Sequence, residues 1–178
     1  NKLKISHVTA KILINRGICK VDEAVDFLNP SLDSLFDPFD LQDMDKAVKR
    51  IEQAARYREH ITIYGDYDVD GITASSVLYD FLIKNGCSVD VYLPDRHNEG
   101  YGINMEALDI IYKRGTDLLI SVDCGITAVE EVEYANKLGM DIVITDHHQC
   151  QTVLPNAMAI VNPRRNLELY NDYQLAGV

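Results

Sequence analysis

The sequence predicts an α/β protein in which a parallel β-sheet is flanked by helices and preceded by a helical N-terminal lead-in. Short apolar runs recur from residue 61 onward, amphipathic helical segments separate them, and the residues before 59 carry helical signals. Strands that alternate with helices are typical of a parallel sheet. We therefore divide the chain into a lead-in, residues 1–58, and a sheet domain, residues 59–178, that is truncated at its C-terminal end.

The lead-in is expected to contain helices separated by loops. A short helix should open at Val21–Ala24, and loops are expected at Asn29–Ser31 and Asp37–Phe39, where proline interrupts the pattern. A further helix is predicted because apolar residues recur there at helical spacing. These residues are Met44, Ala47, Val48, Ile51 and Ala55.

Five apolar runs in the sheet domain are predicted to be buried strands. In chain order they cover residues 61–64, 89–93, 118–122, 142–145 and 157–161. Two of the segments between them carry an apolar stripe of the kind that a helix buries against a sheet. One stripe consists of Ala74, Val77, Leu78, Phe81 and Leu82, and the other consists of Val129, Val132, Ala135 and Leu138.

Composition favours a soluble globular protein of the cytoplasm. The 178 residues are 47% hydrophobic and 25% charged, which is enough apolar material for one substantial core. No apolar stretch approaches the roughly 20 residues that cross a bilayer, and no signal peptide opens the chain. The four cysteines are scattered, which favours reduced thiols over a zinc site or a disulfide framework. The chain stops at Val178 without a helix cap, so we expect a fragment.

Acidic residues and histidines follow three of the predicted strands, in the segments Gly65–Gly71, Asp123–Gly125 and Asp146–His148. Ligands of open parallel sheets bind beyond the carboxyl ends of the strands, so these segments should lie together. A single Asp after a strand is more often a helix N-cap or a turn residue. Several such groups would repel one another unless a cation neutralised them, and metal binding is therefore the better explanation.

The ligand types favour Mn²⁺, with Mg²⁺ as the alternative, because carboxylates and imidazoles without thiolates suit hard or borderline ions. A net charge of −11 argues against indiscriminate binding of nucleic acid, yet bound cations would supply the positive charge that a phosphodiester needs. Asp68 and Asp70 lie two residues apart, and on an extended segment both would point to one face. Adjacent His147 and His148 cannot both point the same way, so one would bind metal while the other faces substrate.

Several motifs are shared with a known family. In the sheet domain they are Tyr64–Ala74, Leu93–Arg96, Glu99–Gly102, Val122–Ile126 and Asp146–His148. In the lead-in they are Asn15–Ile18, Phe27–Pro30, Asp37–Phe39 and Met44–Val48. On these residues, over nearly its whole length, the chain resembles the DHH phosphoesterase superfamily and, within it, the bacterial RecJ exonucleases.

The resemblance implies a site for two metal ions. Asp68 and Asp70 would each bind one ion, and Asp123 would bridge both. His147 would bind one ion, and His148 would contact the scissile phosphate. The implied catalytic residues are thus Asp68, Asp70, Asp123 and His148.

A loop after the second predicted strand would border this site. By resemblance, its residues Arg96, His97 and Asn98 are candidates to contact phosphate or nucleotide. Arg164 and Arg165 are explained equally well as a solvated surface pair or as phosphate ligands.

Two departures from the family pattern concern the metal ligands. Many relatives have a histidine where this chain has Tyr64, which would leave one ion with fewer protein ligands. Asp66 belongs to the same motif as Tyr64, and we expect it to shape the loop or to hold an ordered water.

The second departure is that the family's next metal-binding aspartate lies beyond Val178. The second domain that helps to grip substrate also lies beyond it. The resemblance therefore suggests that the fragment on its own is inactive.

The implied reaction is hydrolysis of a phosphodiester by water that two metal ions activate, without a covalent enzyme intermediate. By resemblance, the substrate is single-stranded DNA, degraded in the 5′-to-3′ direction during recombination and repair. The implied partners are this DNA and the missing C-terminal domain of the same chain, and no membrane is involved.

Two other functions compete with this interpretation. The first is a DHH-family phosphodiesterase for short oligonucleotides, cyclic dinucleotides or pyrophosphate, and the residues before Ile61 speak against it because such enzymes generally lack that segment. The second is a non-catalytic DHH-fold binding module in a replication complex. It would be expected to have lost some of the implied metal ligands, which are Asp68, Asp70, Asp123 and His147, and all of them are present.

Overall fold

The computed structural model describes residues 3–31, 33, 35, 37–96, 98–165 and 175–177. The chain forms two compact units, Asn1–Asp37 and Pro38–Val178. Within the first unit, helix α1 (His7–Asn15) begins after Ser6, whose hydroxyl accepts a hydrogen bond from the amide of Thr9 as an N-cap. Helix α2 (Val21–Leu28) begins where the sequence predicts a short helix.

The second unit is built on a five-stranded parallel sheet with the order β2-β1-β3-β4-β5. Its strands are β1 (His60–Gly65), β2 (Ser88–Tyr92), β3 (Leu118–Val122), β4 (Asp141–Thr145) and β5 (Ala159–Val161). Every predicted strand is present, with bounds that differ by at most two residues. The predicted α/β fold is thus confirmed.

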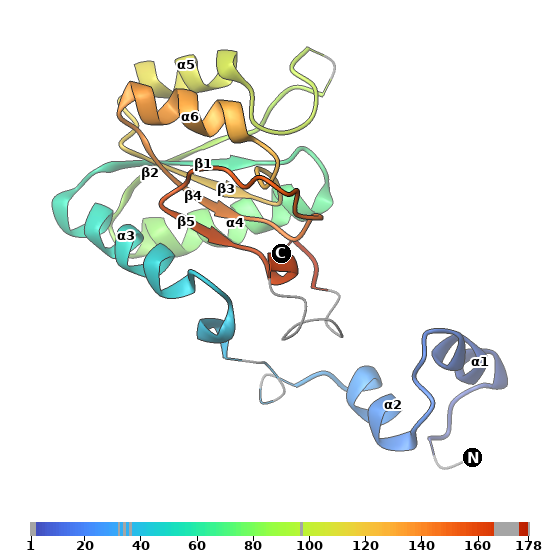
Figure 1. The fold of residues 1–178 in the computed structure, drawn as a ribbon. Coiled ribbons are helices and arrows are strands. Elements are labelled where there is room, and N and C mark those ends of the chain that lie inside the picture. Colours follow the sequence, from blue (N-terminus) through green and yellow to red (C-terminus); the bar gives the residue numbers. More distant parts are fainter. Residues whose placement is uncertain are drawn as a thin grey trace. The chain divides into compact units, whose positions relative to one another are not determined.

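Helices cover both faces of the sheet (Figure 1). Helices α3 (Met44–Tyr57) and α4 (Val69–Lys84) pack on one face, and α5 (Met105–Lys113) and α6 (Val129–Leu138) pack on the other. Alternate strand residues supply the two cores: Ile120 faces α3 and α4, whereas Leu119 faces α5 and α6. Helix α5 had no counterpart in the sequence analysis.

Helix α3, which the sequence analysis assigns to the lead-in, packs against the sheet. It contacts β5, and Arg50 on this helix forms ion pairs with Asp141 at the start of β4 and with Glu59 before β1. The Arg50 side chain is only 7% exposed, and it joins the helix to the sheet through two partly exposed carboxylates. Where the lead-in ends and the sheet domain begins stays a prediction.

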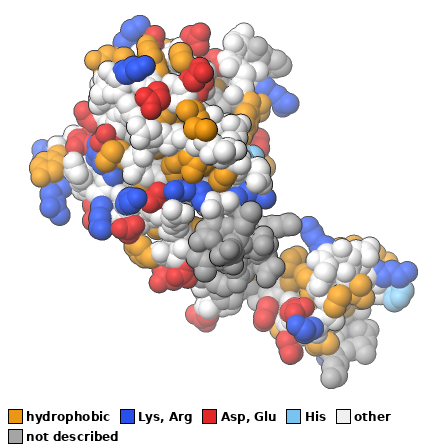
Figure 2. Space-filling view, viewed as in Figure 1, with side chains coloured by type: hydrophobic (Ala, Val, Ile, Leu, Met, Phe, Trp, Pro, Cys, Tyr) orange, Lys and Arg blue, Asp and Glu red, His pale blue; other side chains and the backbone are white. Residues whose placement is uncertain are grey.

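The surface of the second unit mixes side chains of every kind. The face seen in Figure 2 carries acidic, basic and hydrophobic groups side by side. Within the described part of the chain, no helix combines the length and apolarity needed to cross a membrane.

Candidate metal centre

The sheet order places the candidate site at the carboxyl ends of β1 and β3. The chain proceeds from β1 to β2 on one side and then returns to β3 on the other side, so the connections leave β1 and β3 in opposite directions. Such a switch point is where open α/β sheets bind ligands. Gly65 at the end of β1 pairs in register with Val122, which pairs with Thr145 at the end of β4. The three acidic segments therefore begin side by side at the same edge of the sheet.

The segment after β1 begins helix α4 and is not extended. Asp68 is the N-cap of α4, and its Oδ1 accepts hydrogen bonds from the amides of Asp70 (2.9 Å) and Gly71 (3.1 Å). Asp70 lies in the first helical turn, so the expectation that both side chains share a face of an extended segment is wrong. The cap and the metal-ligand interpretations of Asp68 are compatible, because capping uses one carboxylate oxygen.

Gly71 permits the close approach of α4 to the preceding loop. A Cβ at this position would lie 2.6 Å from the carbonyl carbon of Asp66, which leaves room for glycine alone. The Asp66 side chain is buried, and its Oδ1 accepts a hydrogen bond from the amide of Tyr67. Burial raises the pKa of Asp66 above its ordinary value, so a nearby cation would favour its charged form.

Asp123, directly after β3, is held in a conformation that few residues adopt. Its φ is 61°, in the left-handed region, and its amide donates to the carbonyl oxygen of Thr145 at 3.0 Å. Its side chain is nearly inaccessible, and burial together with the carboxylate of Asp68 raises the pKa of Asp123 to about 6. A backbone this constrained at a buried carboxylate is typical of functional sites.

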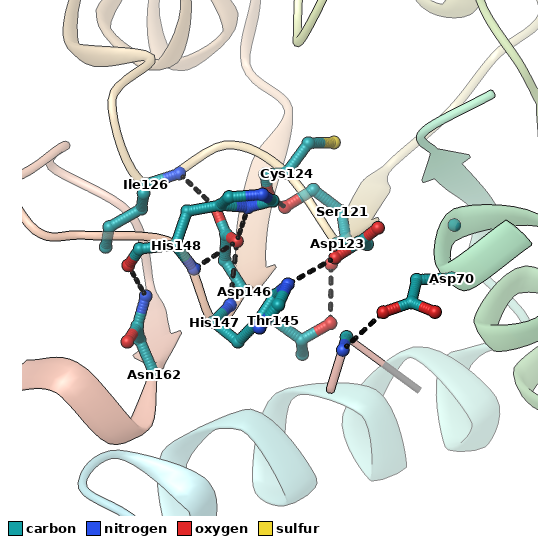
Figure 3. Close-up of polar contacts among 12 residues, drawn as sticks. Asp70, Ser121, Asp123, Cys124, Ile126, Thr145, Asp146, His147, His148 and Asn162 are labelled. Atoms are coloured by element: carbon teal, nitrogen blue, oxygen red, sulfur yellow. Dashed lines mark hydrogen bonds and ion pairs between the residues drawn. The ribbon is translucent and has the colours of Figure 1, made fainter. Parts of the chain in front are cut away.

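Asp146, directly after β4, orders the residues around it (Figure 3). Its Oδ1 accepts hydrogen bonds from the amides of His147 (2.7 Å) and His148 (3.0 Å) and lies 2.7 Å from Nδ1 of His148. Its Oδ2 accepts a hydrogen bond from the amide of Ile126 at 2.9 Å, which ties the β3 loop to the β4 loop. The sequence analysis gave Asp146 no role of its own, although its place in the Asp146–His148 motif indicated that it belongs to the site.

The two histidines lie side by side but have different partners. Their ring centroids are 4.6 Å apart. Nε2 of His147 lies 3.1 Å from Oδ1 of Asp123, and its Nδ1 lies 2.9 Å from the carbonyl oxygen of Leu175. The more exposed His148 is held through Nδ1 by Asp146. These contacts are compatible with the sequence-based expectation that one histidine binds metal while the other faces substrate.

Two groups of side chains could each hold a cation, since their ligand atoms lie within 4.8 Å of one another. One group is Asp66, Asp68 and Asp123, and the other is Asp123, His147 and His148. Asp123 is shared between them. Among the described residues, its buried Oδ1 has no hydrogen-bond donor, although Nε2 of His147 lies 3.1 Å away. Two lone-pair atoms facing each other in this way fit a common cation.

The donor set fits Mn²⁺ or Mg²⁺. It consists of carboxylates and imidazoles, while the thiol of Cys124, the nearest cysteine in sequence, is buried in the core. Asp70, an expected ligand, belongs to neither group, and its Oδ2 accepts a hydrogen bond from the amide of Gly177 at 3.3 Å.

Tyr64, near the end of β1, is part of the core that lies next to the site. It is fully buried and stacks on Tyr92, with ring centroids 5.4 Å apart. Its hydroxyl donates to the carbonyl oxygen of Gly102 at 2.8 Å. Tyr64 thus anchors the loop that follows β2.

That loop borders the two histidines. The hydroxyl of Tyr101 lies 3.3 Å from Nδ1 of His148, and the guanidinium carbon of Arg96 lies 5.3 Å from the ring centre of Tyr67. Asn98 is exposed, and its amide donates to Asp95. His97 lies outside the described residues. A pocket of about 220 Å³ opens between Tyr101, His148 and the start of α6.

The structure separates the two arginines that the sequence left undecided. Arg165 is paired with Asp43 at 2.6 Å and is largely buried, so it stabilises the fold. Arg164 is exposed, and its Nε donates to the carbonyl oxygen of His147 at 2.7 Å, which places its charge next to the site.

Comparison with known proteins assigns a family. The model described as "DHH family, N-terminal domain" matches residues 60–168, which include all three acidic segments. The chain belongs to the DHH family. It is 44% identical over 177 residues to the single-stranded-DNA-specific exonuclease RecJ of Bacillus subtilis, covering 99% of this chain and 22% of that protein.

Solved RecJ structures share the fold of this DHH-family chain. An exonuclease RecJ bound to manganese superposes with a TM-score of 0.70 at 31% identity, covering 80% of this chain and 36% of the other. RecJ from Thermus thermophilus in complex with Mn²⁺ gives a TM-score of 0.67 at 27% identity, covering 92% of this chain and 22% of the other. This chain thus spans well under half the length of these relatives.

Proposed function

We propose that this DHH-family chain is the metal-holding part of an exonuclease that degrades single-stranded DNA in the 5′-to-3′ direction. The observation that carries the proposal is the buried carboxylate of Asp123, which is shared by two groups of ligand atoms and whose Oδ1 has no hydrogen-bond donor within the described part of the chain. The likeness to RecJ proteins, which are described as specific for single-stranded DNA, supports the substrate. The 5′-to-3′ polarity, a role in recombination and repair, and a cytoplasmic location are parts of the same proposal.

Two Mn²⁺ ions, or Mg²⁺ in their place, are the proposed cofactors. Asp68, Asp123 and His147 would hold them, with Asp123 between the two, and Asp70 completes the proposed set. Asp66 is a competing fourth ligand, because its carboxylate lies within 4.8 Å of ligand atoms of both Asp68 and Asp123. When bound, such ions lower the pKa of a water nucleophile and stabilise the negative charge of the reacting phosphate.

The side chains around these ligands would orient the substrate. Asp146 engages Nδ1 of His148, so Nε2 is the nitrogen available to donate a hydrogen bond to a phosphate oxygen when the ring is protonated. Arg96, with the neighbouring His97 and Asn98, is proposed to contact phosphate or nucleotide from the loop after β2. These contacts need no covalent intermediate.

The two competing functions make different demands. An enzyme for cyclic dinucleotides or short oligonucleotides would not need the region before β1, yet the likeness to B. subtilis RecJ covers 99% of this chain. A non-catalytic module in a replication complex would not need an orphaned buried carboxylate, which is costly to retain without a partner. Both observations favour the nuclease. The proposed partners remain single-stranded DNA and the C-terminal domain that follows in the RecJ relatives.

The direct test uses the full-length protein that carries this sequence. Single- and double-stranded DNA labelled at either end is incubated with Mn²⁺, and nucleotide release is followed for the wild type and for Asp123→Asn. Asparagine keeps the size of the side chain and tolerates the left-handed backbone at this position. Asp80→Asn, at an exposed position on α4, is the matched control.

Loss of the single strand from its 5′ end, abolished in Asp123→Asn and retained in Asp80→Asn, is the expected result. Cleavage of cyclic dinucleotides but of no DNA strand would replace the proposal with the small-nucleotide enzyme. Equal activity of Asp123→Asn and wild type would contradict the metal site itself.

A further inference from the structure

The segment Leu175–Gly177 crosses the candidate site, although it lies far along the chain from the strands that build it. Its backbone contacts the side chains of His147 and Asp70, and Gly177 packs against Asp123. Three of the four proposed metal ligands therefore meet one short segment. The fourth, Asp68, is already fixed by the amides at the start of α4.

The contact with His147 determines which ring nitrogen faces Asp123. A carbonyl oxygen only accepts hydrogen bonds, so the 2.9 Å contact between Nδ1 of His147 and the oxygen of Leu175 requires a proton on Nδ1. In the neutral ring, Nε2 then carries the lone pair, and this is the atom 3.1 Å from Oδ1 of Asp123. Histidine ligands are commonly oriented by such a bond from their other nitrogen.

The contact with Asp70 holds that carboxylate in a similar way. The amide of Gly177 donates to Oδ2 of Asp70 at 3.3 Å. Asp70 lies in the first turn of α4, where its side chain is only partly buried and has several accessible rotamers. A single backbone donor on one oxygen restricts these rotamers and leaves the other oxygen available.

The contact with Asp123 explains why a glycine occupies position 177. A Cβ there would lie 2.9 Å from the Cβ of Asp123 and closer still to its carboxylate. Asp123 cannot easily yield, because it is buried and its amide is bonded to Thr145. The φ of Gly177 lies outside the left-handed region, so the backbone conformation does not require glycine. Glycine is required because a side chain at this position would occupy the space of the Asp123 carboxylate.

We propose that Leu175–Gly177 is a positioning segment of the metal site. The carbonyl of Leu175 selects the Nδ1-protonated tautomer of His147, the amide of Gly177 holds Asp70, and the missing side chain of Gly177 leaves room for Asp123. The inference rests on the proposed function for the identity of the ligands. It adds that metal affinity depends on a segment that itself supplies no ligand.

The test is Gly177→Ala, with Ala176→Ser as the control at an exposed position of the same segment. Two quantities are measured in the full-length protein. Ring ¹⁵N shifts of His147 report its tautomer in metal-free protein, and titration with Mn²⁺ followed by electron paramagnetic resonance reports affinity. The added methyl group should displace the segment or Asp123, lower the Nδ1-protonated fraction and weaken Mn²⁺ binding by about 10- to 100-fold. Ala176→Ser should change neither.

A second variant keeps the test decisive if Gly177→Ala folds poorly. Asp123→Gly removes the Cβ that the new methyl group would strike, and its positive φ suits glycine. Adding Gly177→Ala to Asp123→Gly should therefore leave the His147 tautomer unchanged.

The outcomes separate the two proposals. A wild-type protein that binds no Mn²⁺ would overturn the proposed function. A wild-type protein that binds Mn²⁺, with Gly177→Ala matching it in affinity and tautomer, would overturn the positioning role of Leu175–Gly177 and leave the proposed function standing.

Discussion

Replacing Asp146 with asparagine should destabilise the fold, because it breaks the hydrogen bond that ties the β3 loop to the β4 loop. The carboxylate receives donors on each oxygen: the amide of Ile126 on Oδ2, and two amides and the His148 ring on Oδ1. An asparagine has one acceptor oxygen, which the three donors on the Oδ1 side would retain. Its NH₂ group would then face the amide of Ile126. Because both groups only donate hydrogen bonds, the Ile126 amide would be left without an acceptor.

The magnitude follows from these contacts. A hydrogen bond to a charged group contributes about 1.5–3 kcal/mol, and a buried amide left without an acceptor costs a further ~1–3 kcal/mol. The Asp146 side chain is only 1% exposed, so water cannot replace the lost partner. We therefore expect Asp146→Asn to lower the free energy of unfolding by about 3–5 kcal/mol.

The assay is urea unfolding of wild type, Asp146→Asn and Asp80→Asn, with metal-free protein throughout. Asp80 is exposed and, among the described residues, forms an ion pair with Lys84 on the same helix, so its substitution should cost at most about 0.5 kcal/mol. A loss of less than about 1 kcal/mol in Asp146→Asn would show that the carboxylate does not organise the β3 and β4 loops, and the reasoning would fail.

Three further predictions concern the fold and the ligands. Arg50→Ala should lower the free energy of unfolding by about 1.5–3 kcal/mol in urea unfolding, because it removes a buried guanidinium that is bonded to two partly exposed carboxylates, and a cost as small as that of an exposed pair would contradict this. Asp70→Asn and Asp66→Asn should differ in Mn²⁺ affinity measured by calorimetry, and the larger loss identifies the fourth ligand; equal, unchanged affinities would exclude both. Mn²⁺ at 100 times its dissociation constant should stabilise the protein by about 2.7 kcal/mol in thermal unfolding, and Asp123→Asn should show no such gain.

The strands and the acidic segments could be predicted from the sequence because each has a strong local signal. A strand buried on both faces must be apolar along its whole length, as Leu118–Val122 is. Parallel strands bring their carboxyl ends together, so residues far apart in sequence could be assigned to one site from the strand pattern alone. The same reasoning located Asp123 and the Asp146–His148 signature.

Contacts made through the backbone could not be predicted. Nothing in the sequence indicates that the carbonyl of Leu175 meets His147, or that Gly177 faces Asp123, because these contacts depend on where a distant segment passes. The prediction of an extended segment around Asp68 was wrong for a different reason. Its side chain caps a helix, and the capping bonds start α4 one residue later.

The central claim is that Asp123 is shared by two metal ions, and counting bound Mn²⁺ in the full-length protein tests it most directly. Equilibrium binding followed by electron paramagnetic resonance gives both the number of ions and any magnetic coupling between neighbours. We expect two coupled ions in the wild type, and the loss of coupling together with at least one ion in Asp123→Asn. A single ion in the wild type, or two coupled ions that survive Asp123→Asn, would contradict the claim.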